Sequence, residues 1–226
     1  MNDKAIHDIL AGVLKNVLAE INTRPTAPVC AGGDGPIPIE LSARHAHLSE
    51  ADAITLFGAP LTPVRELSQP GQFLCKERVR LIGPKGVMDN VAVLGPSRGS
   101  SQVEISKTDA RSLGIEVPVR QSGEIEDTPG IILASQTGLV ALQNGLIVAA
   151  RHIHMSPEEA RALCVKDKDR VSVRLNSDRP VVLEDVVVRV NKNFKLAMHI
   201  DSDEGNSAGW GNVVTGTIAA RPNGDA

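Results

Sequence analysis

The chain has 226 residues, of which 42% are hydrophobic and 23% charged, so it is long enough for one large or two small globular domains. Its net charge of −3, its three Phe, its single Trp and its lack of Tyr argue against a nucleic-acid-binding protein, which needs positive charge and aromatic rings for stacking. No apolar run has the length of a membrane span and the N-terminus lacks a secretory signal, so we expect a cytoplasmic protein without a membrane partner.

Residues 1–22 predict an amphipathic helix, because apolar side chains recur every three or four positions. Residues 23–37 are rich in Pro and Gly, which indicates a flexible linker between this helix and the body of the chain. The apolar stripe of the helix could fold back onto the body. We favour docking onto another protein, because the polar face carries as many acidic as basic residues and does not suit a membrane surface.

The body of the chain contains a repeated motif. The segment ARHAHLS at residues 43–49 returns as ARHIHMS at residues 150–156, and the start of a helix follows each copy. In each copy the final serine precedes an acidic residue by three positions, Asp52 in the first and Glu159 in the second. This spacing predicts a capping box at both helices.

The repeat extends to a third segment, in which the stretch from Val103 aligns with the stretch from Met198 and puts Glu104 opposite His199. Short alternating runs of Val and Leu, bounded by Gly, Pro and Asp, are typical of strands. The sequence therefore predicts a mainly β fold, with two pseudo-symmetric β-barrel domains and short helices, preceded by the amphipathic helix and its linker. It has neither a Walker nor a dinucleotide-binding glycine motif.

The body contains five histidines, and every one lies in a repeated motif. Alternate residues of a strand point to the same face, so each H-x-H pair offers two imidazoles side by side, as zinc and similar metals require. We expect two metal sites, one made by His45, His47 and Glu104 and the other by His152, His154 and His199. Glu104 could bridge the two ions.

Three protein ligands leave coordination positions open, which is typical of catalytic metal sites. Imidazole and carboxylate ligands suit zinc but also cobalt and iron. The alternative to a metal centre is a set of hydrogen-bonded core histidines, which would need five polar partners near one place.

Arginine residues accompany the expected metal ligands. Arg98 leads into the strand of the expected carboxylate ligand, so we expect its guanidinium group near the metals, where it suits a tetrahedral oxyanion. Arg120 and Ser122 lie in a Gly-terminated turn, which is common with or without a function. Arg44 and Arg151 are expected on the faces of their strands opposite the histidines, where they could form ion pairs.

The repeated motifs, together with LSQPGQF, GPKG, PVRQSG and HIDSDEGNSAG, resemble those of the PduL-type phosphotransacylases, also called phosphate propanoyltransferases. The resemblance covers residues 37 to about 215. It implies reversible transfer of a short acyl group, propanoyl or acetyl, between coenzyme A and inorganic phosphate. It carries the family's ligands for two zinc ions onto the six residues of the two expected metal sites. It also implies that Arg98 contacts phosphate beside Ser122, and that Ser42 and Asn206 contact coenzyme A.

The same resemblance implies a crossed pair of barrels. Residues 38–46 and 150–221 would form the barrel that carries His152, His154 and His199, and residues 47–149 the barrel that carries Glu104 and Arg98. The helix of residues 1–22 resembles an encapsulation peptide. This implies a location in the lumen of a bacterial microcompartment, as in propanediol catabolism, with shell or cargo proteins as partners, and an exposed stripe also suggests a homo-oligomer.

The chemistry implied by these residues is direct attack of phosphate on the thioester, without a covalent acyl-enzyme. Cys75 keeps a covalent route open, and Glu77 could orient a ligand histidine or form a surface salt bridge. Two other functions stay open at this point. The same metal site could activate water, as in a zinc hydrolase of thioesters or phosphoesters, or the chain could be a metal-binding scaffold without activity.

Overall fold

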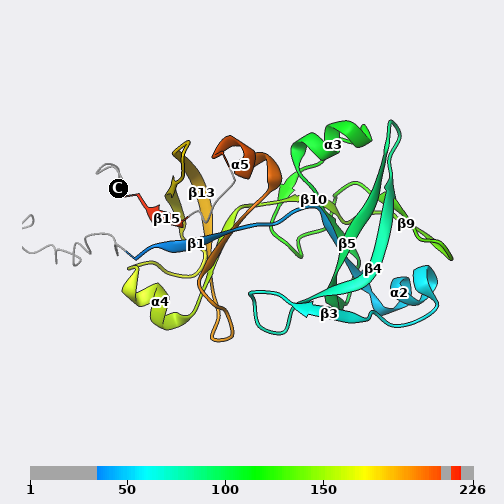
Figure 1. Cartoon of the computed structure of the whole chain (residues 1–226), viewed down its shortest axis with the longest axis horizontal. Coiled ribbons are helices and arrows are strands. Elements are labelled where there is room, and N and C mark those ends of the chain that lie inside the picture. The colour runs from blue at the N-terminus through cyan, green and yellow to red at the C-terminus, as the bar shows by residue number, and fades with distance from the viewer. Residues whose placement is uncertain (1–34, 210–214, 220–226) are drawn as a thin grey trace, which may run out of the picture. The chain divides into compact units, whose positions relative to one another are not determined.

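The computed structural model describes residues 35–209 and 215–219, so the helix expected over residues 1–22 lies outside the described part of the chain (Figure 1). Residues 32–226 belong to one compact unit. Strands make up most of the regular structure, and the helices are short, as the sequence predicted. None of the helices in the described ranges is long and apolar enough to cross a membrane.

Six strands close into a barrel. Their order around it is β1 (Ile37–Leu41), β14 (Ala197–Ile200), β11 (His152–Met155), β13 (Val181–Val190), β12 (Arg170–Asn176) and β15 (Thr215–Ile218). Alternate residues of β12 are buried, so Val171, Val173 and Leu175 fill the interior while their neighbours face outward. The barrel half is therefore confirmed, with a core of Val, Ile, Leu and Met.

The other half of the body is a curled nine-stranded sheet. The strands follow the order β7 (Val119–Arg120), β10 (Leu146–Ala149), β6 (Gln102–Glu104), β2 (His45–Ser49), β5 (Val87–Arg98), β4 (Phe73–Ile82), β8 (Ile131–Ala134) and β9 (Leu139–Leu142), and β3 (Pro63–Glu66) pairs with β4. The two ends of this order, β7 and β9, do not pair with each other. The sequence predicted two barrels, and this half is a curled half-barrel with its own apolar core.

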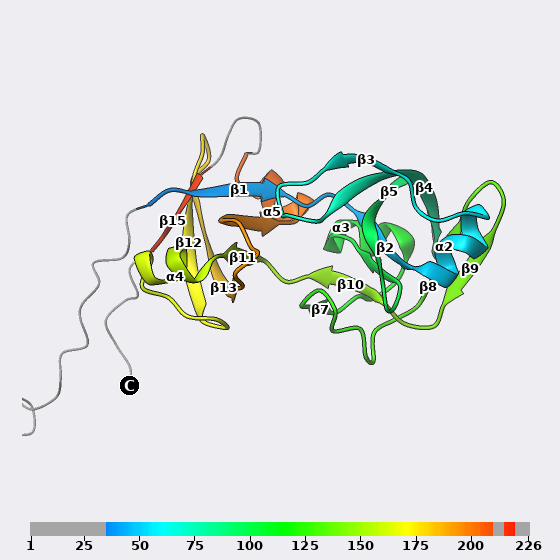
Figure 2. The same cartoon turned by 90° about the horizontal axis from the view of Figure 1, so that it is seen from below.

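The chain crosses from the barrel to the sheet within a few residues. β1 lies in the barrel, parallel to β14, whereas β2 lies between β5 and β6 of the sheet (Figure 2). The expected boundary after residue 46 stays a prediction, and the observed pairing places the first residues of β2 on the sheet side. His45 and Ala46 belong to the sheet, because their backbones pair with β6.

The register of the strands shows the pseudo-symmetry directly. His45 of β2 pairs with Glu104 of β6, and His152 of β11 pairs with His199 of β14. Each of the four strands leads into a short helix, namely α2 (Glu50–Phe57), α3 (Lys107–Leu113), α4 (Pro157–Ala162) and α5 (Ser202–Ser207). The alignment of Glu104 with His199 thus reflects equivalent positions in two related units.

The capping box at α4 forms as expected, with Ser156 and Glu159 exchanging hydrogen bonds. The reciprocal box expected at α2 does not form. Asp52 N–H donates to Ser49 Oγ, but the Ser49 N–H donates to Ser101 Oγ at 2.8 Å instead of to the Asp52 carboxylate. That carboxylate accepts hydrogen bonds from both serine hydroxyls, which leaves the backbone donor to Ser101.

Several polar contacts join the barrel to the sheet, and one of them is a hydrogen bond from the Ser68 hydroxyl to the Glu40 carboxylate of β1. The amide of Gln69, in the loop between β3 and β4, donates to Lys195 O at 2.9 Å and accepts from Lys195 N–H at 3.3 Å. The carboxylate of Asp203 on α5 accepts a hydrogen bond from Thr108 N–H in the first turn of α3. These contacts join the half that carries β2 to the half that carries β11 and β14, the three strands that bear the histidines.

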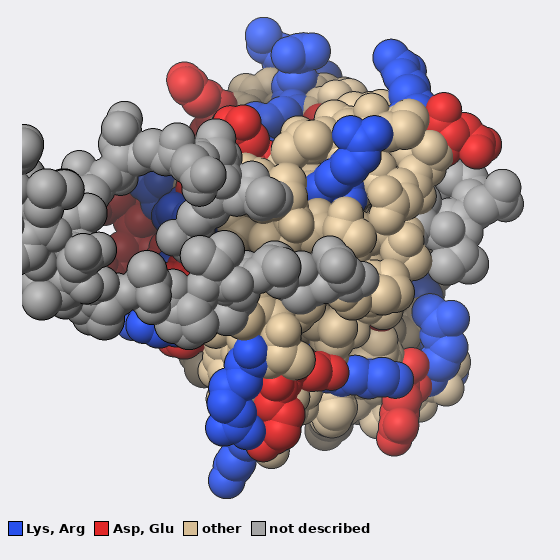
Figure 3. All heavy atoms as spheres, turned by 90° about the vertical axis from the view of Figure 1, so that its left-hand side faces the viewer, with Lys and Arg blue, Asp and Glu red and all other residues tan. Residues whose placement is uncertain are grey.

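The end of the body that carries the barrel has charged side chains of both signs. In Figure 3, basic and acidic residues are interspersed around an uncharged area of the described surface. This face presents no continuous positive patch among the described residues.

Candidate active site

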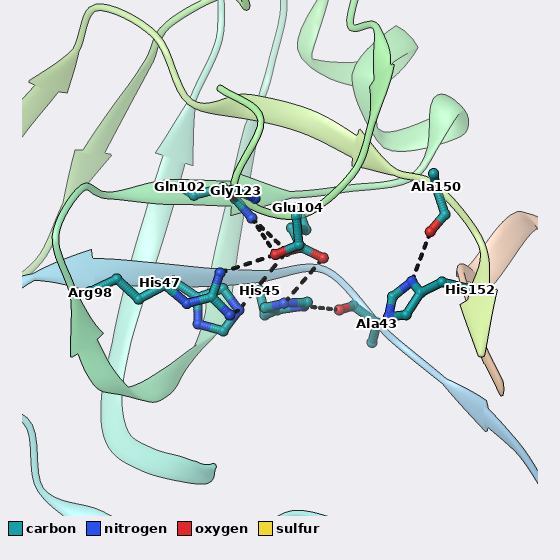
Figure 4. Close-up of polar contacts among 10 residues, drawn as sticks. Ala43, His45, His47, Arg98, Gln102, Glu104, Gly123, Ala150 and His152 are labelled. Carbon is teal, nitrogen blue, oxygen red and sulfur yellow. Dashed lines mark hydrogen bonds and ion pairs between the residues drawn. The ribbon is translucent and has the colours of Figure 1, made fainter. Parts of the chain in front are cut away.

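The strand β2 places His45 and His47 on the same face, because they are alternate residues. The neighbouring strand β6 places Glu104 beside them (Figure 4). His45 Nε2 lies 3.5 Å from Glu104 Oε2, and His47 Nε2 lies 3.9 Å from Glu104 Oε1. One ligand atom from each of these buried residues lies within 4.8 Å of the other two, so the structure assembles the first expected cluster.

The second cluster forms in the same way on the barrel. The ring centroid of His152 lies 4.7 Å from that of His154 and 5.1 Å from that of His199. One nitrogen from each ring lies within 4.8 Å of the others. The structure therefore brings together all six residues of the two predicted metal sites, three in each cluster.

A cavity between barrel and sheet joins the two clusters. It is lined by Ser42, Glu104, Ile105, Ala149, Ala150, His152, His199, Ile200 and Asp201. Figure 4 shows His152 on the barrel side of this region and His45 with Glu104 on the sheet side. Ser42, predicted at the coenzyme A site, lines the cavity and donates its backbone N–H to Ile200 O. The structure thus places Glu104 of the sheet cluster, His152 and His199 of the barrel cluster, and Ser42 around one space.

The hydrogen bonds of the histidines test whether the residues fit a metal ion. His45 Nδ1 lies 2.8 Å from Ala43 O, and His152 Nδ1 lies 2.8 Å from Ala150 O. Because a carbonyl only accepts, each Nδ1 carries a proton, which in a neutral imidazole leaves the lone pair on Nε2.

Three other ring nitrogens are buried without a hydrogen-bond partner among the described residues, namely His47 Nδ1, His154 Nδ1 and His199 Nε2. Buried core histidines would normally have partners for such atoms. The donor set of imidazoles and one carboxylate fits a divalent cation in each cluster.

Burial keeps the imidazoles of His47, His152, His154 and His199 neutral. Burial, together with the charges of neighbouring histidines and arginines, lowers the pKa of His154 to about 2 and that of His47 to about 3. Burial is also the main cause that lowers the pKa values of His152 and His199 to about 4. A neutral imidazole is the form that binds a metal.

Glu104 stays ionised although it is buried. Burial alone would raise its pKa, but His45, His47, the Ser122 hydroxyl and Arg98 outweigh burial and lower the pKa to about 2. The sheet cluster therefore contains an ionised carboxylate at neutral pH. The equivalent position of the barrel cluster is a third imidazole, that of His199.

Arg98 and Ser122, the two predicted catalytic residues, meet at this carboxylate. Arg98 Nη1 donates to Ser122 Oγ at 3.0 Å, and Ser122 Oγ donates to Glu104 Oε1 at 2.7 Å. Arg98 Nη2 lies 2.9 Å from His47 Nε2. Arg120, from the same turn as Ser122, is exposed and donates only to the adjacent Val119 O among the bonds described.

Cys75 and Glu77 stand apart from the histidine clusters. Cys75 is fully buried in the apolar core of the sheet, where burial and the charge of Glu77 raise the thiol pKa to about 11. The Glu77 carboxylate accepts a hydrogen bond from Thr62 N–H, so it supports the segment that leads into β3.

Arg44 and Arg151 form equivalent ion pairs, as expected from their positions. Arg44 pairs with Asp109 of α3 at 2.8 Å, and Arg151 pairs with Glu204 of α5 at 3.1 Å. Asn206, predicted to contact coenzyme A, lies on α5 and is exposed.

Sequence reasoning missed several residues around the clusters. Arg189 of β13 pairs in register with His154, and its positive charge lowers the pKa of all three barrel histidines. Glu40 of β1 pairs in register with His199, and its Oε2 lies 3.7 Å from His199 Nδ1. Gln102, on β6 beside Glu104, is the third residue that the sequence did not reveal. A basic residue inside the apolar run VVVRV was the available signal for Arg189.

Comparison with known proteins identifies the family of this arrangement. Residues 38–211 match the sequence model for phosphate propanoyltransferases. The chain belongs to the phosphate propanoyltransferase family. It is therefore an acyltransferase, and the resemblance seen in its motifs is confirmed.

Curated phosphate propanoyltransferases match most of the chain. The protein of Alkaliphilus metalliredigens is 54% identical over 80% of this chain and 87% of its own length. That of Klebsiella pneumoniae is 47% identical over 91% of this chain and 97% of its own length. That of Listeria monocytogenes is 44% identical over 96% and 97% of the two lengths.

Proposed function

We propose that this phosphate propanoyltransferase moves a propanoyl group reversibly between coenzyme A and inorganic phosphate, in the cavity between the barrel and the sheet. The observation that carries this proposal is the pair of pseudo-symmetric three-ligand clusters at one cavity, with Arg98 held beside one of them. An acetyl group would differ by one methylene and is the second acyl group that we propose.

Two divalent cations, which we propose to be zinc, would be held by His45, His47 and Glu104 and by His152, His154 and His199. When bound, they would supply Lewis-acid stabilisation for a thiolate leaving group and for phosphate oxygens. The buried nitrogens without partners and the ionised Glu104 support this proposal.

The protein's own residues would bind and orient the reactants. Arg98 would hold phosphate through its guanidinium N–H groups, since a planar fork matches two oxygens of a tetrahedral oxyanion. Ser122 would keep the guanidinium in place, because its hydroxyl accepts from Arg98 and donates to Glu104. We carry the coenzyme A contacts of the family onto Ser42, which lines the cavity, and Asn206 on α5.

The transfer would be a single displacement at the acyl carbon. A phosphate oxygen attacks the thioester carbonyl, the carbon–sulfur bond breaks, and coenzyme A leaves as the thiolate while acyl phosphate forms. Holding both reactants in one cavity lowers the entropic part of the barrier. The buried Cys75 thiol, with its raised pKa, gives no support to a covalent acyl-enzyme.

Metal analysis of the purified chain, combined with a coenzyme A release assay, tests this function. We expect two zinc ions per chain and release of coenzyme A from propanoyl-CoA only when phosphate is present, with acyl phosphate as product. Release without phosphate would instead identify a zinc hydrolase of thioesters, the second candidate. A chain without divalent metal would contradict the proposed site.

We further propose that residues 1–22 direct the enzyme to the lumen of a bacterial microcompartment through shell or cargo proteins, and that the enzyme forms a homo-oligomer. The spacing of apolar residues in this segment supports the proposal. Deleting residues 1–22 should leave activity in the purified enzyme intact while abolishing its uptake into compartments. Loss of activity on deletion would show that the segment is part of the folded body.

A further inference from the structure

Gln102 lies buried between the predicted carboxylate ligand and the predicted phosphate-binding pair. It sits on β6, pairs in register with His47, and is 2% exposed. Its Nε2 lies 2.6 Å from Glu104 Oε1 and 3.0 Å from Ser122 Oγ (Figure 4). Its Oε1 accepts a hydrogen bond from Gly123 N–H at 2.7 Å. The side chain thus contacts both Glu104 and the turn that carries Ser122.

The orientation of the Gln102 amide follows from these contacts. A backbone N–H can only donate, so the atom that faces Gly123 must be the amide oxygen. The NH₂ group therefore faces Glu104 and Ser122, and each of its hydrogens has an acceptor.

The direction of the remaining hydrogen bonds is then fixed. Ser122 Oγ accepts from Gln102 Nε2 and from Arg98 Nη1, and neither nitrogen can accept in return. The one hydroxyl hydrogen of Ser122 must therefore go to Glu104 Oε1, at 2.7 Å. Glu104 Oε1 accepts two hydrogen bonds in this arrangement, whereas Oε2 faces His45 Nε2 at 3.5 Å.

The pseudo-symmetry provides an independent comparison. His47 pairs with Gln102 in the sheet, and the equivalent His154 pairs with Ala197 in the barrel. The third ligand of the barrel cluster is an imidazole with a single nitrogen to offer. A carboxylate has two oxygens, so only the sheet cluster needs a residue that selects between them.

We propose that Gln102 is a positioning residue that reserves Glu104 Oε2 for the cation of the sheet cluster and, through Ser122, holds Arg98 ready for phosphate. This inference rests on the proposed metal site. Partners that orient a metal ligand typically change metal affinity by about 10-fold to 100-fold when they are removed.

The test replaces Gln102 with Met, which retains approximate size but cannot hydrogen bond. Its matched control is Gln69→Met, since Gln69 is also buried, at 4% exposure, and its amide contacts only the Lys195 backbone among the described hydrogen bonds. Chelator competition would measure the affinity of each zinc ion in the full chain. We expect Gln102→Met to lower the affinity for one of the two zinc ions by about 10-fold to 100-fold and to raise the KM for phosphate. The Gln69→Met variant should keep both zinc affinities.

Three outcomes would overturn the inference, namely unchanged zinc affinity in Gln102→Met, an equal loss in Gln69→Met, or a change confined to the other zinc ion. A Glu104→Gln variant assigns which ion belongs to the sheet cluster. If the parent chain binds no zinc, the proposed function itself fails, which is a distinct result.

If Gln102→Met does not fold, Ser122→Ala takes its place, because it removes one of the two donors to Glu104 Oε1. Weaker binding of the sheet-cluster zinc ion in Ser122→Ala would support the inference. Unchanged zinc affinity in this variant would overturn it.

Discussion

Buried ring nitrogens without partners are costly at the level of single residues. His154 Nδ1 and His199 Nε2 have lost hydration without gaining a hydrogen bond within the described part of the chain. A cation that binds only the folded protein would offset this cost. At a free metal concentration about 1,000 times the dissociation constant, one such ion stabilises the fold by about 4 kcal/mol.

We therefore predict that metal removal destabilises the enzyme. Stripping both ions with a chelator should lower the melting temperature by about 10 °C or more, since each kcal/mol corresponds to about 2–4 °C in a chain of this size. Thermal unfolding with and without chelator measures the shift, and added zinc should restore it. An unchanged melting temperature would contradict the binding of two metal ions to the folded protein.

The second prediction at this scale concerns Arg98. Replacing it with Ala should lower turnover by about 100-fold to 1,000-fold, because a charged donor to the reacting phosphate is lost. Arg98→Lys keeps the charge but not the planar guanidinium, so its turnover should lie between that of the parent enzyme and that of Arg98→Ala. Zinc content should stay at the parent level in both variants. Unchanged turnover in Arg98→Ala would remove this residue from the mechanism.

Cys75 provides the opposite expectation. A thiol buried in the sheet core, with a pKa of about 11, is almost wholly protonated at neutral pH and is a weak nucleophile. Cys75→Ala should keep kcat and the KM for both substrates within about twofold, at a cost of about 1–2 kcal/mol in stability from the small cavity. Steady-state kinetics measure this, and loss of acyl transfer in a folded variant would restore the covalent route.

The sequence predicted the six residues of the two clusters, because H-x-H pairs on strands need only a local periodicity and the repeat linked Glu104 to His199. It did not predict Gln102 or Arg189. Their roles depend on which residues lie opposite them across the sheet, and that register is set by long-range pairing. Neither role open to Glu77, support of a ligand histidine or a surface salt bridge, accounts for its hydrogen bond from Thr62 N–H.

At the level of elements, the helix starts illustrate how far a local motif can be interpreted. The Ser156 box depends only on residues three positions apart and forms as predicted. At α2 the same spacing is present, but Ser101 from the loop before β6 takes the backbone donor. A partner about 50 positions away cannot be seen in a four-residue pattern.

This difference leads to a prediction about stability. Ser156→Ala should cost about 1 kcal/mol, which is typical of a lost helix cap. Ser101→Ala should cost a similar amount although it lies outside any helix, because Ser49 N–H and the Asp52 carboxylate each lose a partner. Urea unfolding of both variants measures the two costs. A neutral Ser101→Ala would show that water replaces this hydroxyl.

At the level of the whole molecule, contacts between barrel and sheet keep the two clusters together. Gln69→Met removes both hydrogen bonds to the Lys195 backbone, and we predict a loss of about 1–3 kcal/mol, or a fall of several degrees in melting temperature. Thermal unfolding measures this loss. An unchanged melting temperature would show that Gln69 does not help to hold barrel and sheet together.

The repeat in the sequence revealed two related halves, but it did not show which half closes into a barrel and which stays an open sheet. The barrel closes because β1 and β15 pair with each other and with strands on both sides. The sheet ends instead at the two-residue β7 and at β9. These outcomes depend on pairing between distant strands, which periodicity does not encode. The crossover of the first strand followed from family resemblance alone.

The crossover of β1 into the barrel also affects the order in which the two halves can fold during synthesis. Ile39 of β1 is synthesised long before Met198 of β14, with which it pairs in the barrel. The barrel cannot close until β14 and β15 have left the ribosome, whereas β2, β4, β5 and β6 can already pair with one another. The barrel is therefore expected to be the last part to fold, with an unpaired strand exposed to wrong partners until then.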